Sequence, residues 1–290
     1  MSEYDSPWKE VIEAFFQDFL AFFYPPAHDD IDWHKGYEFL DKELEKVVRD
    51  SELGRRLVDK LVRVWRLDGE EELVLIHVEV QGQHDKQFAK RMYTYNHRIF
   101  DRYDRKVASL AILADSSATW HPDHFSYDLW GSRSGLWFPV VKLLDYRERW
   151  KALEAETNPF AIAVMAHLQS VATAKDIASR LSWKLRLTKL LYNKGYSRTT
   201  VLELFRFIDW VIELPDDMHH QFQQEISAYE KEKKMRYVTS IERDSERNTS
   251  VRIATALLDI IEDDSVIAEK TGLTVAEVKQ LREQDKSNDE

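Results

Sequence analysis

The chain has 290 residues, no cysteine and a net charge of −11, because 41 Lys and Arg stand against 52 Asp and Glu. The lack of cysteine excludes disulfides, thiolate zinc sites and cysteine nucleophiles, and it fits a reducing, cytoplasmic location. The acidic balance excludes a general basic coat for nucleic acid, so such a ligand would have to meet local basic patches. The sequence has no signal-peptide pattern and no apolar run near the roughly 20 residues of a membrane span, so we expect no membrane association.

Two helical segments are predicted at the start of the chain. Residues 7–24 carry apolar side chains at helical spacing, and a pair of prolines ends the pattern. Residues 30–50 place acids between apolar positions with a similar period. Glu43 and Glu38 are the acids of this second segment that could lean toward the strands that follow, although a single helix carboxylate is more often solvated.

Residues 58–83 contain two β-type runs that meet at an Asp-Gly turn. The first run alternates between two faces, and the second, residues 73–80, is almost wholly apolar and rich in Val and Ile. Asp68 and Gly69 between the runs form a strong β-hairpin signal.

The register of this hairpin decides whether its acids meet. Glu79 and Gln81 are two apart on one strand and therefore share a face. A loop with an odd number of residues, such as 68–70, places Asp59 directly opposite Glu79. A two-residue loop would place Asp59 opposite Val78, with the acids on opposite faces unless a bulge intervened. We predict the odd loop or a bulge.

Two carboxylates at this spacing would repel one another unless a cation lay between them. Carboxylate oxygens suit Mg²⁺, or Mn²⁺ as an alternative, and these ions take the rest of their ligands from water and phosphate. The spacing supports equally well a pair of acids, Asp59 and Glu79, that simply reach solvent.

Residues 88–103 are predicted to form a helix with one apolar stripe and one basic flank. Seven Lys or Arg stand against three Asp between residues 81 and 106, which favours a surface that faces phosphate, although basic helix flanks are often only solvated. The apolar stripe is Phe88, Met92, Tyr95, Ile99 and Tyr103, and the basic flank is Arg91, Arg98, Arg102 and Arg105.

The remaining strand signals complete an α/β domain with a mixed sheet flanked by helices. Residues 107–114 form a uniformly apolar, buried strand, and residues 138–144 add another. Residues 119–137 between them are interpreted as a long loop. From residue 147 the strand signals stop and helical periods follow. The predicted domains are 1–146 (α/β), 147–262 (helical) and 263–290 (a short helical hairpin and a frayed tail).

A second basic cluster lies in the helical part of the chain. Residues 175–198 hold seven Lys or Arg, among them Lys184 and Lys189, against one acid, Asp176. This cluster could follow a nucleic-acid backbone or balance the acidic remainder of the protein, and the sequence supports both interpretations equally.

The segment 265–284 predicts two short helices. Gly272 is placed to end the first, and Thr274 with Glu277 forms a capping box for the second. The pair could be the first two helices of a helix-turn-helix, but its basic surface is thin, so a hairpin used for packing or for a homodimer is at least as good an interpretation.

Several catalytic motifs are excluded or weak. His77-x-Glu79 matches half of a zinc deaminase signature, which also requires a cysteine pair. His121 and His124 have no evident third metal ligand. Neither a Gly-rich phosphate loop nor a serine nucleophile elbow is present.

With these residues in place, the chain resembles the PD-(D/E)XK nuclease superfamily, and within it the bacterial recombination-promoting nuclease and putative transposase family. The resemblance covers roughly residues 40–260 and rests on the order of its blocks. These are YEFLDKEL at 37–44, DKLVRVW at 59–65, LIHVEVQGQ at 75–83, FAKRMYTYNHRIFDRY at 88–103, NPFA at 158–161 and FIDWVIELP at 207–215.

The resemblance implies a restriction-endonuclease-like core and a Mg²⁺-dependent DNA endonuclease linked to recombination or mobile elements. Asp59 matches the metal-binding Asp, Glu79 matches the acid of the Glu-x-Lys strand, and Glu43 matches an additional acid on the first helix. Gln81 stands where Lys is most common, and a Gln can hydrogen-bond but cannot supply a positive charge.

The same resemblance assigns phosphate contacts to the basic residues Arg91, Arg98, Arg102, Lys184 and Lys189. Its alternative is a nuclease-fold protein with little or no activity that serves as a DNA-binding or partner-binding module, and the exchange at Gln81 favours that alternative. Cleavage of RNA is a third option that only a panel of substrates can test.

Overall fold

The computed structural model describes residues 7–42, 44, 58–79, 86–233, 251, 253–258, 260–261, 263–271 and 273–288. The chain divides into two compact units, Met1–Asp216 and Asp217–Glu290, and each is described by itself.

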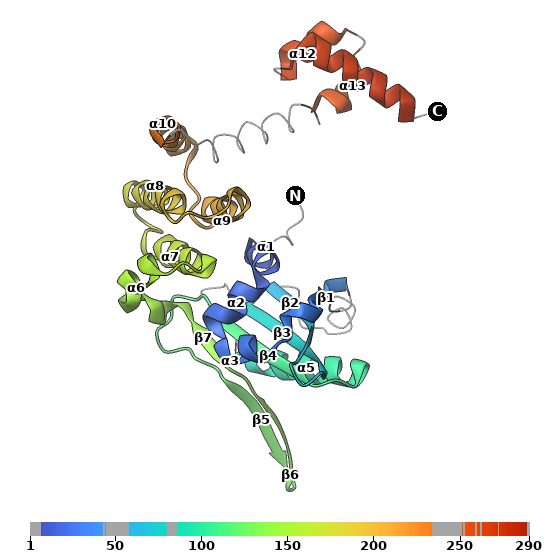
Figure 1. The fold of residues 1–290 in the computed structure, drawn as a ribbon, viewed down its shortest axis with the longest axis vertical. Helices are drawn as coiled ribbons and strands as arrows, with labels where there is room; N and C mark the ends of the chain where they lie inside the picture. Colours follow the sequence, from blue (N-terminus) through green and yellow to red (C-terminus); the bar gives the residue numbers. More distant parts are fainter. Residues whose placement is uncertain are drawn as a thin grey trace. The chain divides into compact units, whose positions relative to one another are not determined.

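The first unit is built on a mixed five-stranded sheet (Figure 1). Its strands, in spatial order, are β1 (Tyr37–Phe39), β2 (Val58–Trp65), β3 (Glu71–Glu79), β4 (Val107–Leu113) and β7 (Val140–Lys142). The first three strands are antiparallel, whereas β3, β4 and β7 are parallel to one another. The predicted α/β class with a mixed sheet flanked by helices is therefore confirmed.

Helix α5 (Phe88–Tyr103) connects β3 to β4 and covers one face of the sheet. Its apolar stripe faces the sheet. Phe88 and Met92 pack on Ala111 and Leu113, and Tyr95 and Ile99 pack on the apolar cluster that contains Leu61 and Leu73. These four stripe residues are no more than 1% exposed, as their helical spacing predicts.

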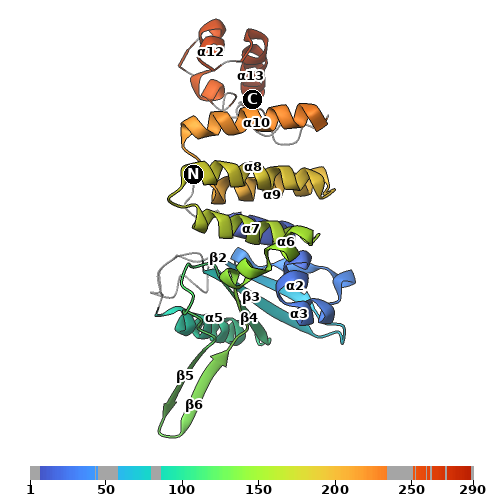
Figure 2. The same cartoon turned by 90° about the vertical axis from the view of Figure 1, so that its left-hand side faces the viewer.

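The N-terminal helices lie on the other side of the sheet (Figure 2). They are α1 (Pro7–Ala14), α2 (Phe16–Phe23) and α3 (Pro25–Asp30). Tyr24, which follows α2, donates its hydroxyl hydrogen to Ala111 O of β4 at 2.7 Å. The predicted helix over 7–24 is thus two helices that join at Phe15, whose backbone is not helical.

The second predicted helix, over 30–50, is wrong for its first half. This part of the chain contains the 3₁₀-helix η1 (Trp33–Lys35) and strand β1. Gly36 has φ 75°, a left-handed conformation that ends η1 and turns the chain into β1. Pairing of β1 with β2 overrides the helical period of the sequence.

The predicted loop over 119–137 is instead a β-hairpin made of β5 (His124–Leu129) and β6 (Ser132–Trp137). The strands are joined by Trp130 and Gly131, whose φ values of 54° and 82° match a two-residue hairpin turn. Figures 1 and 2 show this hairpin extending away from the five-stranded sheet.

A helical layer follows the sheet within the same unit. It consists of η2 (Leu143–Arg149), α6 (Trp150–Ala155), α7 (Pro159–Ala172), α8 (Ile177–Asn193) and α9 (Arg198–Val211). The side chains of Asn158, Asp176 and Ser197 cap the N-termini of α7, α8 and α9. The predicted succession of helices is therefore confirmed.

The predicted domain boundary at residue 147 does not coincide with the division into compact units. Trp8 of α1 packs edge-on against Phe207 of α9 at 4.9 Å, and Phe19 of α2 packs against Phe160 of α7 at 5.3 Å. The N-terminal helices thereby join the sheet to the helical layer, so both belong to one unit.

The second unit contains α10 (Asp216–Lys233), whose first residue belongs to the first unit, α12 (Asp264–Thr271) and α13 (Val275–Asn288). Thr274 N donates to Glu277 Oε2 at 2.8 Å and Glu277 N donates to Thr274 Oγ1 at 3.3 Å, which confirms the capping box. Arg282 of α13 donates to the carbonyls of Leu258 and Ile261.

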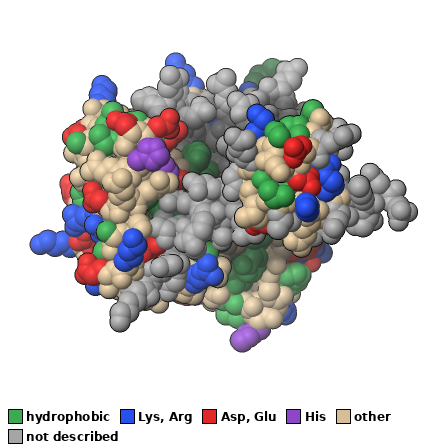
Figure 3. Space-filling view, turned by 90° about the horizontal axis from the view of Figure 1, so that it is seen from above, with side chains coloured by type: hydrophobic (Ala, Val, Ile, Leu, Met, Phe, Trp, Pro, Cys, Tyr) green, Lys and Arg blue, Asp and Glu red, His purple; other side chains and the backbone are tan. Residues whose placement is uncertain are grey.

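Basic and acidic side chains are interspersed over the described parts of the face drawn in Figure 3. Among the helices that the structure describes, none combines the length and the apolar character needed to cross a membrane.

Candidate metal centre and nucleic-acid interface

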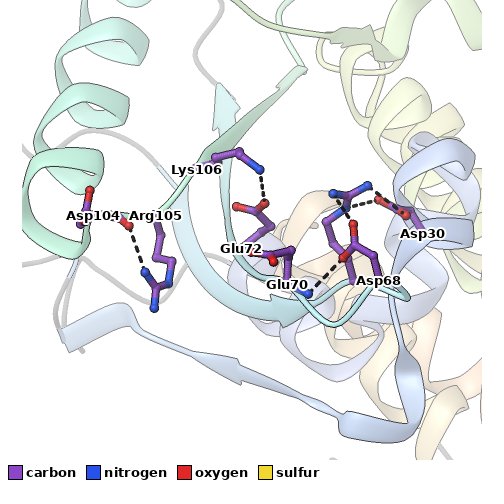
Figure 4. A network of polar contacts seen from close by, with 8 residues as sticks. Asp30, Asp68, Glu70, Glu72, Asp104, Arg105 and Lys106 are labelled. Atoms are coloured by element: carbon purple, nitrogen blue, oxygen red, sulfur yellow. Dashed lines mark hydrogen bonds and ion pairs between the residues drawn. The ribbon is translucent and has the colours of Figure 1, made fainter.

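Polar contacts fix the turn between β2 and β3 (Figure 4). Arg66 N donates to Glu70 O at 2.8 Å, and Glu70 N donates to Asp68 Oδ1 at 3.0 Å. The Arg66 guanidinium binds Asp68 at 2.8 Å and Asp30 at 2.6 Å. Leu67 N donates to Asp30 O, so Leu67 contacts the N-terminal segment and not β3. The loop therefore lies between Arg66 and Glu70 and has an odd number of residues.

This turn sets a register that differs from the predicted one. Asp59 pairs with His77, and Glu79 lies two positions further along β3. The prediction that Asp59 stands directly opposite Glu79 is wrong. A loop over residues 68–70 would pair Leu67 with Glu71, whereas Glu71 pairs with Trp65, and the register of the whole hairpin is therefore shifted by two residues. The prediction of a loop with an odd number of residues is confirmed. Because His77 and Glu79 are two residues apart on β3, the positions of Asp59 and Glu79 belong to the same face of the sheet.

Asp59 and Glu79 lie at the same end of the sheet, where β2 begins and β3 ends. Asp59 is the second residue of β2, and Glu79 is the last residue of β3. Diagonal positions of an antiparallel pair are roughly 7–8 Å apart, a span that two carboxylates can bridge through one cation. Glu79 pairs with Leu113, so the carboxyl end of β4 lies at the same end of the sheet.

The other two predicted site residues, Gln81 and Glu43, lie outside the described residues. For Asp59 and Glu79 the structure describes the backbone position. Among the side chains that it does describe, no three His, Asp or Glu residues form a group that could hold a metal ion. Glu38, the remaining acid considered from the sequence, lies in β1 and binds Arg63 at 2.6 Å.

Lys60, next to Asp59 in β2, is a buried cation with two carboxylate partners. It is 3% exposed, and its ammonium lies 2.7 Å from Glu13 and 2.5 Å from Asp41. These acids balance the charge of Lys60, so we do not assign it the role of the lysine that Gln81 replaces.

The predicted basic flank of α5 runs along the sheet and does not converge on one point. Because α5 connects two parallel strands, its N-terminus lies near the carboxyl end of β3 and its C-terminus near the start of β3. Arg91 is 8% exposed and lies in the N-terminal half of α5, whereas Arg98 is half-buried and Arg102 is exposed. Arg91 and Arg102 are separated by about 16 Å along the helix axis.

At the opposite end of β3, basic residues that follow α5 meet the acids of the first strand positions (Figure 4). Lys106 binds Glu72 at 3.2 Å, and Arg105 lies 3.9 Å from Glu71. Of the predicted phosphate contacts on α5, Arg91 is therefore the one that lies at the same end of the sheet as Glu79.

The basic cluster over 175–198 is used largely within the helical layer. Lys184 is 1% exposed and its ammonium lies 2.7 Å from Asp209, so it does not contribute to a surface that nucleic acid could contact. Arg180 donates to the carbonyls of Val211 and Glu213 at the end of α9. Lys189 is half-buried on the same helix as Lys184. These contacts favour internal charge balance, one of the two interpretations of the sequence.

A buried ion pair that the sequence did not predict lies beyond the carboxyl end of β4. Asp115 and Lys142 are 2% and 3% exposed, and their charged atoms are 2.5 Å apart. Lys142 also donates to Trp120 O, and Ser117 N donates to Asp115 Oδ1. An acid just after a largely apolar strand was a visible signal, but its partner, 27 residues further on, was not.

His167 of α7 closes the same polar cluster. Its Nε2 lies 2.6 Å from Ala114 O. Burial lowers the pKa of His167 to about 4, because the imidazolium would lose its hydration, and the Ala114 carbonyl and Asp115 oppose this effect only in part.

We expect this histidine to make the fold sensitive to acid. The unfolded chain binds the proton near pH 6.5 and the folded chain only near pH 4, so the contribution is intact above pH 6.5 and declines as the pH falls toward 4. By pH 5 the loss is about 2 kcal/mol. Urea unfolding at pH 7 and pH 5 measures it, and His167→Gln, which retains an N–H donor, should lose less. Equal losses in both proteins would exclude His167 as the cause.

Comparison with known proteins gave no match to a family model, to a curated protein or to a solved structure.

Proposed function

We propose that this chain is a metal-dependent nuclease that hydrolyses phosphodiester bonds in DNA. The observation that carries the proposal is the β2–β3 register, in which the positions of Asp59 and Glu79 share one face of the sheet and lie at the same end of it. The mixed sheet flanked by helices supports the proposal, because the resemblance implies a restriction-endonuclease-like core of that general kind.

The residues fit a hard divalent cation because both candidate ligands are carboxylates. Asp59 and Glu79 would hold Mg²⁺, with Mn²⁺ as an alternative. When bound, such an ion lowers the pKa of a water ligand and polarises a phosphate oxygen. Gln81, two residues beyond Glu79, would orient the attacking water by hydrogen bonding. Arg91, which lies at the same end of the sheet and is 8% exposed, would add positive potential near the phosphate without a direct contact.

The test is a cleavage assay with single-stranded DNA, double-stranded DNA and RNA in Mg²⁺, in Mn²⁺ and in a chelator. We expect DNA cleavage that requires a divalent ion. Binding of DNA without cleavage under every condition would favour the alternative, a nuclease-fold protein that binds DNA or a partner, for which Gln81 in place of Lys is the specific observation. Cleavage confined to RNA would contradict the proposed substrate.

The Gln81→Lys variant separates these functions further. A lysine adds positive charge where negative charge develops on the phosphate, and one such donor is worth roughly 10²–10³ in rate in other enzymes. Because Gln81 already supplies a hydrogen bond, we expect kcat to rise by about tenfold in Mg²⁺. A matched Gln17→Lys variant, at an exposed position of α2 on the other side of the sheet from α5, should leave kcat unchanged. A fall in kcat for Gln81→Lys would show that the glutamine has a role that a lysine cannot fill.

A further inference from the structure

The tip of the β5–β6 hairpin holds a tryptophan that is almost completely exposed. Trp130 is 97% exposed and its neighbour Leu129 is 57% exposed. In both ribbon views the tip is the part of the hairpin farthest from the five-stranded sheet (Figures 1 and 2). Scattered exposed apolar residues are ordinary, but a tryptophan exposed almost completely at the end of an arm is suited to contact with another molecule.

The backbone holds this tryptophan in an unfavourable conformation. Leu129 pairs with Ser132, so Trp130 and Gly131 form a two-residue turn with φ of 54° and 82°. The first position of such a turn favours Asn, Asp or Gly, and a bulky residue with positive φ is a genuine outlier. Arg133 binds Asp128 at 2.8 Å just behind the turn. The turn therefore carries a bulky side chain at a position where a small or polar residue is usual.

The hairpin is attached to α5 along its length. The Tyr93 hydroxyl lies 2.6 Å from Ser134 Oγ, and the Tyr93 ring contacts Phe125 at 5.1 Å and stacks on His97 at 4.8 Å. Ser134 is two residues from Ser132, where β6 begins at the turn, so the tip extends about 10 Å beyond this anchor.

Charge indicates which kind of molecule the arm meets. The anchor helix and its ends, residues 86–106, carry seven Lys or Arg against two Asp in a protein of net charge −11, and two of the seven, Lys106 and Arg105, lie next to Glu72 and Glu71 of β3. The arm itself, residues 123–137, carries one Arg, Arg133, which is 86% exposed, against two Asp. The hairpin is nearly neutral, and the helix that anchors it is basic. This combination suits a polyanion whose backbone lies on α5 and whose apolar groups lie at the hairpin tip.

We propose that Trp130 stacks on a base of a bound polynucleotide while the α5 arginines contact its backbone. A two-stranded β-ribbon fits the DNA major groove, and aromatic side chains stack on unpaired bases or wedge between base steps. This inference rests on the proposed function, since it takes the polynucleotide substrate as the ligand. It adds a contact that depends on stacking and not on charge.

The test measures binding of the full chain to a fluorescent DNA oligonucleotide without divalent ions, across a salt series. Trp130→Asn removes the ring and keeps the turn, because Asn-Gly is a preferred hairpin turn. Stacking on one base corresponds to about a 5- to 150-fold change in Kd, so we expect a weakening in that range with an unchanged salt dependence. Trp130→Tyr should recover most of the affinity.

Two comparisons make this result specific. Trp210→Ala removes another exposed tryptophan, 51% exposed on α9, and should leave Kd unchanged. The double variant Arg98→Gln, Arg102→Gln should weaken binding and reduce the salt slope, because these side chains contact phosphate.

The inference is overturned if Trp130→Asn binds DNA as tightly as the wild type, or if the wild type binds no DNA. If Trp130→Asn differs from the wild type in oligomeric state, measured by sedimentation, but binds DNA equally well, the tip contacts another copy of this chain and the inference is likewise overturned. Because the assay contains no divalent ion, Trp130-dependent binding by a protein that never cleaves would contradict only the proposed function. Wild-type binding by Trp130→Asn in a chain that cleaves would contradict only this inference.

Discussion

Asp59→Asn and Glu79→Gln are each expected to reduce Mg²⁺-dependent DNA cleavage by more than about 100-fold. Loss of groups that merely orient metal ligands lowers metal affinity or activity about 10- to 100-fold, so loss of a ligand itself should exceed this. Both substitutions keep the size of the side chain and remove its charge. Their effect should therefore appear in cleavage and not in folding.

The melting temperature of each variant without metal shows whether Asp59 and Glu79 bind a metal ion or stabilise the fold. If the two carboxylates repel each other in the absence of a cation, removing either charge should leave the melting temperature unchanged or raise it. Glu71→Gln changes an acid at the opposite end of β3 and should retain cleavage, so it serves as the matched control. Wild-type cleavage by both Asp59→Asn and Glu79→Gln would exclude the proposed site.

Asp115→Asn and Lys142→Met are expected to have the largest effects on stability, at about 3–5 kcal/mol each. Each substitution leaves one member of a buried pair without its counter-charge, in a place where both side chains are no more than 3% exposed. The double variant should be more stable than either single variant, because no unpaired charge remains. Urea unfolding at pH 7 measures all three.

The control for this pair is Asp128→Asn on the β5–β6 hairpin. Its partner, Arg133, is 86% exposed, so water replaces the interaction and the change should stay below about 1 kcal/mol. If the losses of Asp115→Asn and Lys142→Met simply add in the double variant, the two residues do not act as a pair.

The sequence predicted the parts of the fold that depend on local periodicity. The apolar stripe of α5 and the uniform apolar run of β4 both identified buried elements, because each pattern matches the geometry of one element. The capping box at Thr274 and Glu277 was likewise visible, since all of its atoms come from neighbouring residues.

The errors arose where residues distant in sequence decide the structure. The register of Asp59 depends on Asp30, whose carbonyl accepts from Leu67 N and whose carboxylate binds Arg66. No pattern within the hairpin contains that information. The β5–β6 hairpin was missed for another reason: Trp130 occupies a turn position where Asn or Asp is the usual signal.

The basic cluster on α8 illustrates the same limit for the candidate site. Counting charges identified Lys184, but its burial against Asp209 follows from the packing of α8 on α9, 25 residues away in sequence. Arg91, in contrast, was identified by helical spacing alone, and it lies at the same end of the sheet as Glu79, because a crossover helix runs opposite to its strands.

The most direct measurement of the central claim is a calorimetric titration of Mn²⁺ into the metal-free chain and into the Asp59→Asn, Glu79→Gln double variant. We expect the wild type to bind the ion and the double variant to lose this binding, with the Glu71→Gln control behaving as the wild type. Equal binding by the wild type and the double variant, or no binding by the wild type, would contradict a metal centre at Asp59 and Glu79.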